Sequence, residues 1–512
     1  MKPVKFTSTV SGASLLIATF AIASKGLGFL REVIFASIYG LSVEFDIYLI
    51  GAVIPLTINT IILCIGQNYF VPVLNKTTKE NPQKSLSFVR SNILFFFIGG
   101  VFISLLLFLT AESILAVFIK DTNVKNFNNT LNVYLLFLLT IPITAIISLI
   151  IGYFQARSEF KYSVSSSIIP NIIVLLVVYF WGNHNILAIP VGFVIGNFIQ
   201  LVYLILASKE IISTHTSGKF YGKFFYSSNV LSILIIVSIE IIGQLYAISD
   251  RYFYNLVSVG AISALNYAYT IFLLPISILS ISLTTALFPK FSKLFNEGKI
   301  DELEKVFNHG MIVSVGIFIP IMILFIVYGN TLLGLVFERG NFSTNETRIT
   351  SQVLSYYSLG IVFYAVYAVI NKLFYSSSML KSLFYISVVG IIVKVMINFI
   401  LVNLMAQNGL ALGTTISYTF FFLVSITTIR KKLRFKSRIK FSSTFLFYLL
   451  NGIFSMLVAF ILSDTLLVQK LLGVFVFVIV YSINLIILKS SLLQILKTTF
   501  IQNIIPNFKE GY

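Results

Sequence analysis

The stretch ISVVGIIVKVMINFILV, residues 386–402, carries a lysine, Lys394, in the middle of a long apolar run. Two further runs show the same pattern. They are SLLIATFAIASKGLGFL, residues 14–30, around Lys25, and ILIIVSIEIIGQLYAI, residues 233–248, around Glu240. A charge at the centre of a bilayer costs roughly 2.5–3.5 kcal/mol, so it is retained mainly where it faces a wet cavity or a partner. Three such charges indicate a membrane protein with a polar path through its interior, which favours a transporter.

The composition of the 512 residues is that of an all-α integral membrane protein. Hydrophobic residues make up 57% of the chain and charged residues 11%, whereas soluble domains carry about 25% charged residues. Fourteen apolar stretches approach the roughly 20 residues that a bilayer requires, which predicts 14 transmembrane helices. They are residues 11–38, 45–72, 91–111, 131–155, 163–181, 186–208, 225–250, 261–288, 309–331, 349–372, 382–405, 408–428, 443–464 and 467–489.

The net charge is +18, and the Lys and Arg residues behind it are distributed unevenly between the two sides of the predicted spans. With a cytoplasmic N-terminus, 27 of the 36 Lys and Arg residues fall in inner segments and 6 in outer segments, while Lys25, Arg31 and Lys394 lie inside helices. This alternation is the positive-inside pattern, so we expect both termini in the cytoplasm and no nucleic acid as a partner. We interpret the basic run 430–440 as a topology anchor rather than a specific lipid or nucleic-acid site.

The sequence offers no support for conventional catalysis. A single cysteine, Cys64, excludes an internal disulfide and a cysteine-based metal cluster. The three histidines are far apart in sequence, and no GxxxxGK[ST] phosphate loop or Ser/His/Asp grouping is present. We therefore expect a protein that is not an enzyme and has no metal or cofactor. Its energy source would be an ion gradient, the membrane potential or the flux of substrate.

The chain resembles itself at a spacing of 220 residues. The matching pairs are Arg31 and Arg251, Gly40 and Gly260, Pro55 and Pro275, Phe154 and Phe374, and Lys161 and Lys381. This spacing predicts two pseudo-symmetric six-helix lobes, residues 1–224 and 225–440, followed by a helix pair and a cytoplasmic tail, residues 441–512. Parallel repeats of this kind place a substrate site at their interface near the midplane of the membrane. The two prolines, each in the second helix of its lobe, either shape packing or act as flexure points.

The charges in the membrane form a candidate anion site. Lys25 and Glu32 are seven residues apart on one stripe of the first helix, and Lys394 and Asn398 share a face four residues apart. Pairing of Glu240 with one of the lysines as a buried salt bridge remains an alternative. Even then, two central lysines against one glutamate leave surplus positive charge. With two arginines near the outer mouth, such a cavity favours a diphosphate or an acidic sugar.

The segment SKGLGFLREVIFASIYGLSVEFDIYLIGAVIP, residues 24–55, resembles the opening of the MurJ (MviN) lipid II flippases within the multidrug/oligosaccharide-lipid/polysaccharide exporter superfamily. The resemblance extends over nearly the whole chain. It includes NYFVPVLNK (68–76), SDRYFYNLVSVGAISALNYAY (249–269), TTALFPKFSK (284–293), FERGNFS (337–343) and NGLALGTTIS (408–417). It implies two six-helix lobes around a V-shaped cationic cavity, with helices 13 and 14 forming a groove for a polyprenyl tail.

The resemblance also assigns individual residues. Arg31 and Asp46 match charged positions that are important in the family, and Lys25 replaces an arginine with its charge kept. A lysine is a point charge, so bidentate contact with a phosphate would be lost there.

Other positions depart from the family pattern. Asn59 and Thr60 stand where members carry an arginine pair, Thr270 stands where an arginine is expected, and Leu273 occupies a position that is often acidic. Much of the family's diphosphate clamp is therefore missing. Either Lys394 and Arg251 substitute for it, or the headgroup is not that of lipid II.

We thus expect a flippase that moves an undecaprenyl-diphosphate-linked saccharide across the bacterial inner membrane by alternating access. The saccharide would be that of lipid II or a surface-polysaccharide or O-antigen repeat unit. Coupling to the membrane potential or a monovalent cation stays open, and membrane lipids are the other partners. The predicted headgroup contacts are Lys25, Arg31, Lys394, Arg251, Asn59 and Asn398, and the predicted gating or coupling residues are Asp46, Glu240 and Glu32.

Two other functions remain open. A cation-coupled multidrug exporter of the same superfamily would need an acidic or aromatic cavity, against which the central lysines argue. A non-transporting scaffold for cell-envelope enzymes would show changed stability, but unchanged export, when its buried charges are neutralised.

Overall fold

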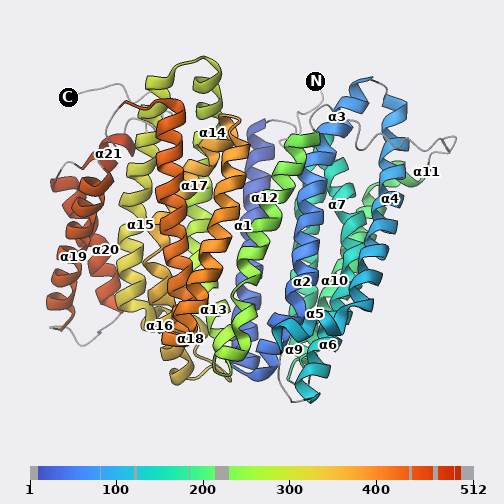
Figure 1. Ribbon diagram of the computed structural model, residues 1–512, viewed down its shortest axis with the longest axis horizontal. Helices are drawn as coiled ribbons and strands as arrows, with labels where there is room; N and C mark the ends of the chain where they lie inside the picture. Colours follow the sequence, from blue (N-terminus) through green and yellow to red (C-terminus); the bar gives the residue numbers. More distant parts are fainter. Residues whose placement is uncertain are drawn as a thin grey trace. The chain divides into compact units, whose positions relative to one another are not determined.

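The computed structural model describes residues 10–80, 82–119, 124–183, 185–213, 230–436, 441–464, 471–488 and 490–496, and over these ranges the chain is helical without a β-strand (Figure 1). Their contacts group into two compact units. Unit 1 lies within residues 1–263 and 339–343, and unit 2 lies within residues 264–338 and 344–512. The predicted lobe boundaries at 224 and 440 stay a prediction.

Unit 1 holds the first twelve α-helices, one π-helix and one 3-10 helix. They are α1 (Val10–Tyr39), α2 (Val43–Ile65), the π-helix η2 (Gly66–Phe70), α3 (Val71–Glu80), α4 (Pro82–Leu109), α5 (Ala111–Phe118), α6 (Val124–Leu138), α7 (Thr140–Ala156), α8 (Phe160–Ser166), α9 (Ile168–Trp181), α10 (Ala188–Ala207), α11 (Lys209–Ser213), α12 (Val230–Ile248) and the 3-10 helix η4 (Arg251–Leu256).

Unit 2 begins inside the next helix, whose first three residues belong to unit 1. Its helices are α13 (Ala261–Pro275), the π-helix η5 (Ile276–Ser280), α14 (Ile281–Asn296), α15 (Ile300–Phe337), α16 (Thr344–Ser358), α17 (Ile361–Ser376), α18 (Leu380–Leu433), α19 (Phe441–Asp464), α20 (Leu471–Ile487) and α21 (Ser491–Leu496).

The long helix α18 is a hairpin of two arms. Its backbone leaves the helical region at Ala406, where φ is 49° and ψ is −131°. Lys432 Nζ lies 2.5 Å from Ser382 Oγ, although a straight helix would separate these residues by about 75 Å. The predicted spans 382–405 and 408–428 are therefore the two antiparallel arms of α18.

Membrane character is visible in both the length and the surface of the helices. Among the described residues, nine helices are long and apolar enough to cross a bilayer, and ten if the bent pair α16 and α17 counts as one span. One of the nine is the α18 hairpin, and the predicted count of fourteen stays a prediction. Large apolar side chains are exposed along these helices, as expected where lipid rather than water surrounds them: Phe102 59%, Leu109 70%, Leu404 73% and Ile461 68%.

The backbone repeats at the spacing of 220 that the sequence shows. Gly40 and Gly260 have φ values of 54° and 79°, and Ser158 and Ser378, which were not part of the sequence match, have 59° and 56°. Left-handed φ is uncommon outside glycine, so its recurrence at one offset is specific. The prediction of an internal repeat is thus supported at the level of local conformation.

A π-helix interrupts the second long helix of unit 1, at Gly66–Phe70, and the first long helix of unit 2, at Ile276–Ser280. In unit 1 this bulge lies against α7, where a Cβ on Gly66 would be 2.7 Å from the backbone oxygen of Ser148. The serine side chain donates to Ile62 O at 3.2 Å. π-bulges occur frequently at functional sites and bend the helix that holds them. Pro275 directly precedes the second bulge, whereas Pro55 lies buried inside α2.

The last two long helices pack on α15 within unit 2. Figure 1 shows α19 and α20 side by side. Tyr481 of α20 donates its hydroxyl hydrogen to Gly316 O of α15 at 3.0 Å. On α19, Gly452 approaches Ile323 so closely that a Cβ would be 2.3 Å from its Cδ1. The helix pair that the sequence places outside the repeat is therefore fixed to α15 by close packing.

Candidate functional site

Arg31, one of the predicted headgroup contacts, is held by polar and aromatic neighbours within unit 1. Its Nη1 donates to Asn171 Oδ1 of α9 at 3.1 Å, and its Nη2 pairs with Glu32 Oε1 at 3.0 Å. The guanidinium carbon lies 5.7 Å from the ring centroid of Phe35 and 5.2 Å from that of Phe193. Cation–π contacts of this kind hold the charge in place without neutralising it. Arg31 Nε is buried and has no hydrogen-bond partner within the described residues.

Lys25 lies six residues before Arg31 on α1 and is exposed. Its neighbour Ser24 meets Ser167, the residue directly before α9, with the two hydroxyl oxygens 3.3 Å apart. This contact turns the Ser24 side of the helix toward α9. With Arg31 and Glu32, Lys25 gives this part of α1 a net charge of +1.

Asp46 is fully buried near the start of α2. Its carboxylate accepts hydrogen bonds from Gly260 N at 2.7 Å, Ser263 N at 2.8 Å and Ser263 Oγ at 2.5 Å. These donors lie at the N-terminus of α13, where the helix leaves backbone N–H groups unpaired and favours negative charge. Asp46 therefore caps the first turn of α13 within unit 1, and its predicted gating role stays a prediction.

Arg251 and Glu240 make contacts inside unit 1. Arg251 Nε donates to Leu49 O of α2 at 3.2 Å. Glu240 accepts a hydrogen bond at 2.9 Å from Gln244, one turn further along α12. Both side chains are half-buried. An ion pair between Glu240 and Lys25 is not found among the described residues of this unit.

Asn59 stands where the resemblance expects an arginine, and its buried side chain makes a hydrogen bond between helices. It is 7% exposed, and its Nδ2 donates to Thr140 Oγ1 at 2.7 Å. That hydroxyl in turn donates to Phe137 O at 2.6 Å, at the break between α6 and α7. The amide thus joins α2 to a broken helix and brings no positive charge.

Lys394 and Asn398 lie inside unit 2 with 1% and 0% exposure. They share one face of the first arm of α18, as their spacing predicts. On the second arm, Gly413 packs directly against the side-chain amide of Asn398. A Cβ added at Gly413 would lie only 2.2 Å from Asn398 Oδ1. Thr414 and Ser417 beside it are also buried. Lys394 is therefore enclosed in a polar cluster of the hairpin, and contact with a headgroup would require this cluster to open.

Unit 2 also contains a cavity of about 310 Å³ that sequence reasoning missed. It lies beside the π-helix η5 and has a mainly apolar wall, to which three elements add polar side chains, including Ser280, Tyr364, Asn371 and Lys372. Ser280 Oγ and Asn371 Oδ1 are buried and lack hydrogen-bond partners in the described part of the chain. The Lys372 ammonium lies 6.0 Å from the ring centroid of Phe288.

The signal for this cavity was weak in the sequence. Lys372 lies at the end of the predicted span 349–372, where the distribution of Lys and Arg counts it among the 27 inner residues that set topology. Asn371 precedes it on the face of α17 that meets η5, but nothing in the sequence indicates that a π-helix forms there. The Lys372 ammonium and the Ser280 hydroxyl can donate, whereas Asn371 Oδ1 only accepts, so this set suits a hydroxyl-bearing ligand.

Comparisons with known proteins identify the family. A family model described as lipid II flippase MurJ matches residues 35–486. A probable lipid II flippase MurJ from Borreliella burgdorferi is 26% identical over 431 residues, which is 83% of each chain. A lipid II flippase MurJ from Thermosipho africanus is 24% identical over 483 residues, covering 92% of this chain and 96% of the relative.

Solved structures agree on the fold. A structure titled lipid II flippase MurJ, inward closed conformation, has a TM-score of 0.77 at 22% identity and covers 93% of this chain and all of that one. An inward-facing multidrug resistance transporter of the MATE family has a TM-score of 0.65 at 11% identity, covering 80% and 94% of the two chains. Both likenesses show the shared architecture of the fold.

Proposed function

The chain belongs to the lipid II flippase MurJ family, and we propose that it moves an undecaprenyl-diphosphate-linked saccharide across the bacterial inner membrane by alternating access. Both termini lie in the cytoplasm in this proposal, following the distribution of Lys and Arg. The relatives that it matches are named as flippases.

The arrangement of Arg31 carries the proposal. A guanidinium presents a planar fork of donors that matches a phosphate, and charge-assisted hydrogen bonds of this kind are the strong ones. Arg31 is fixed in advance by Asn171 and by two aromatic rings, so little side-chain freedom is lost when a ligand binds. Exposed Lys25 lies about 9 Å further along the helix axis. Lys25 shares a stripe of α1 with Glu32 rather than with Arg31, so it raises the positive charge near Arg31 from a neighbouring face of the helix.

Arg251 and Lys394 would contribute later in the cycle. Arg251 is bound to the backbone of α2, and Lys394 is 1% exposed. Alternating access needs elements with more than one stable arrangement. We propose that the charges now enclosed become available when α2 and the α18 hairpin change position, with Asp46, Glu240 and Glu32 as gating or coupling groups. Coupling to the membrane potential or to a monovalent cation belongs to the same proposal.

Lipid II is the first candidate substrate because the matched relatives carry that name. A surface-polysaccharide or O-antigen repeat unit is the second candidate. The contact of Asn59 with Thr140 favours it, because this position ties two helices together and supplies no cation for a diphosphate. Mass spectrometry of the lipids that accumulate when the gene is depleted distinguishes the two.

The proposal is tested with the full-length protein in proteoliposomes and a fluorescent undecaprenyl-diphosphate saccharide, whose leaflet is read with a membrane-impermeant quencher. We expect Arg31→Ala to slow translocation at least about tenfold, since a hydrogen bond to a charged group is worth roughly 1.5–3 kcal/mol. Arg31→Lys should fall between this variant and the wild type, because it keeps the charge and loses the fork.

The matched control is Arg348→Ala. Arg348 is exposed on α16, binds Asn345 at 3.2 Å and lies outside the cluster, so its loss should leave the rate unchanged. Equal translocation by the wild type and by well-folded Arg31→Ala would contradict the proposal.

A further inference from the structure

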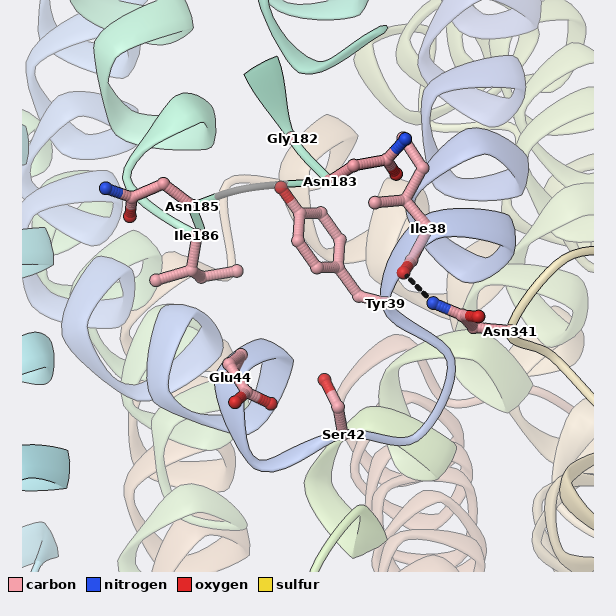
Figure 2. Close-up of a pocket in the computed structure, with 9 residues that line it drawn as sticks. All are labelled: Ile38, Tyr39, Ser42, Glu44, Gly182, Asn183, Asn185, Ile186 and Asn341. Carbon is pink, nitrogen blue, oxygen red and sulfur yellow. Dashed lines mark hydrogen bonds between the residues drawn. The ribbon is translucent and has the colours of Figure 1, made fainter.

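A second cavity, of about 260 Å³, lies in unit 1 where α1 ends (Figure 2). Its wall is mostly polar and comes from four separate parts of the sequence: the end of α1, the start of α2, the connection between α9 and α10, and the loop after α15. The lining residues are Ile38, Tyr39, Ser42, Glu44, Gly182, Asn183, Asn185, Ile186 and Asn341.

Backbone contacts fix the wall before any ligand is present. Asn341 N donates to Ser37 O at 2.7 Å, and its side-chain Nδ2 donates to Ile38 O at 2.6 Å, the contact drawn in Figure 2. Gly340 has φ +58°, and a Cβ there would lie 2.3 Å from Ser37 O, so this loop is seated tightly on α1. On the opposite wall, Asn185 Oδ1 accepts from Leu187 N at 2.9 Å. The cavity is therefore preorganised.

Tyr39 presents an unsatisfied hydroxyl to this cavity. The residue is 8% exposed, and its ring stacks on Phe45 with centroids 5.9 Å apart and planes 12° apart. The hydroxyl oxygen has no hydrogen-bond partner among the described residues. It lies against Gly182, where a Cβ would be 2.9 Å away, and Figure 2 shows it directed toward the Gly182–Asn183 segment. A buried polar group without a partner is costly, so a ligand that pairs with it gains that energy.

The other free groups complete a mixed set of donors and acceptors. Within the part of the chain that the structure describes, the Glu44 carboxylate and the Asn183 amide make no hydrogen bond or ion pair, and both residues are exposed at the cavity. Glu44 accepts only, an amide both donates and accepts, and a tyrosine hydroxyl does either. No lysine or arginine is present in the described lining. A single carboxylate without a cation repels a diphosphate and suits the hydroxyl groups of a neutral ligand.

We propose that this cavity binds a neutral sugar residue. The source of the sugar, the lipid-linked saccharide, rests on the proposed function. The volume of about 260 Å³ is near the lower end of ligand sites, so it accommodates about one sugar ring. In the predicted topology α1 ends on the outer side of the membrane. The site would therefore hold the saccharide after translocation, separate from the cationic cluster of Arg31 that binds the diphosphate.

An intrinsic fluorophore lies next to this cavity and can report binding. The chain's single tryptophan, Trp181, directly precedes Gly182 and is 38% exposed. We suggest titrating the full-length protein in nanodiscs with N-acetylglucosamine and following tryptophan emission. A saturable change in emission is expected, and inorganic pyrophosphate should give none. Trp181→Phe should abolish the signal and so confirm its origin.

Side-chain variants locate the binding. Tyr39→Phe removes only the unpaired hydroxyl, so the fold should hold while the Kd for the sugar rises roughly five- to tenfold. Asn183→Ala should have a similar effect. The matched controls are Tyr179→Phe, a tyrosine 69% exposed beside the reporter, and Asn403→Ala, an exposed asparagine bound to Phe399 O. Neither should change the Kd.

Three results of these titrations would overturn the inference of a sugar site. No saturable response to sugar, or equal affinity in Tyr39→Phe and the wild type, overturns the inference. A response to Ca²⁺ or Mg²⁺ that disappears in Glu44→Gln, with none to sugar, also overturns it and makes the cavity a cation site. The translocation assay is independent of these results, because sugar binding without transport of any lipid-linked saccharide would refute the proposed function and leave the sugar site standing.

Discussion

Removal of the Asp46 carboxylate tests whether its hydrogen bonds to the first turn of α13 stabilise the folded protein. The Asp46→Ala variant deletes three hydrogen bonds to a fully buried charged group and leaves Gly260 N and Ser263 N without their acceptor. Breaking a buried charged interaction from one side costs about 3–5 kcal/mol, mainly because the remaining groups stay desolvated and unpaired. We therefore expect a loss of about 4 kcal/mol in the free energy of unfolding.

The size of this effect is tested through Ser263. Ser263→Ala removes the hydroxyl donor at 2.5 Å and leaves both backbone donors in place, so it should cost about 1–2 kcal/mol. The double variant should be little less stable than Asp46→Ala alone, because the hydroxyl bond is already lost in that variant. Such non-additivity would assign the effect to this contact rather than to a general disturbance of α2.

The assay is the unfolding of purified protein in mixed micelles, followed by size-exclusion chromatography. The matched control is Asp301→Ala, which removes an exposed aspartate paired with Lys436 at 3.2 Å. An exposed ion pair contributes about 0–1 kcal/mol, so this variant should unfold close to the wild type. If Asp46→Ala unfolds together with Asp301→Ala, the capping argument is refuted.

Three further predictions concern other parts of the chain. Gly340→Ala should destabilise more than Gly298→Ala in the same unfolding assay, because both have positive φ but only Gly340 faces a backbone oxygen at 2.3 Å; equal losses would contradict this. Lys372→Met should slow translocation about tenfold without changing stability, since the ammonium lies at the cavity of unit 2, whereas exposed Lys381→Met should not. Arg157, hydrogen-bonded to Glu210 at 2.5 Å, lowers the pKa of that carboxyl. A lowered carboxyl pKa adds stability above the usual glutamate pKa of about 4.3, and this is lost as the pH falls through the lowered value. The effect is small because Glu210 is 61% exposed, and Glu210→Gln should flatten the acidic limb of the unfolding temperature against pH.

Local features of the fold could be predicted from the sequence. Apolar length located helices, and the gap between the predicted spans at 405 and 408 contains Ala406, where α18 turns back. The match of Gly40 to Gly260 corresponds to a shared left-handed conformation, which only glycine adopts at low cost. These features follow from short-range properties of the chain.

The partners of the charged residues could not be predicted. Arg31 meets Asn171 across 140 positions, and Asp46 meets Ser263 across 217. The spacing of Lys394 and Asn398 gave them a common face, but periodicity does not reveal whether a face meets a cavity or the other arm of a hairpin. Burial of 1% for Lys394 depends on helix packing over long sequence distances.

Residues 339–343 belong to unit 1, although the 75 residues 264–338 of unit 2 precede them in the chain. During synthesis on a ribosome, the N-terminal unit therefore cannot be completed when residue 263 emerges. At roughly 5–20 residues per second, about 4–16 s pass before Asn341 can reach Ser37 and Ile38. Over that interval the end of the first helix lacks the contacts that Asn341 makes with Ser37 and Ile38, so a chain that stops at residue 263 lacks part of the packing of unit 1.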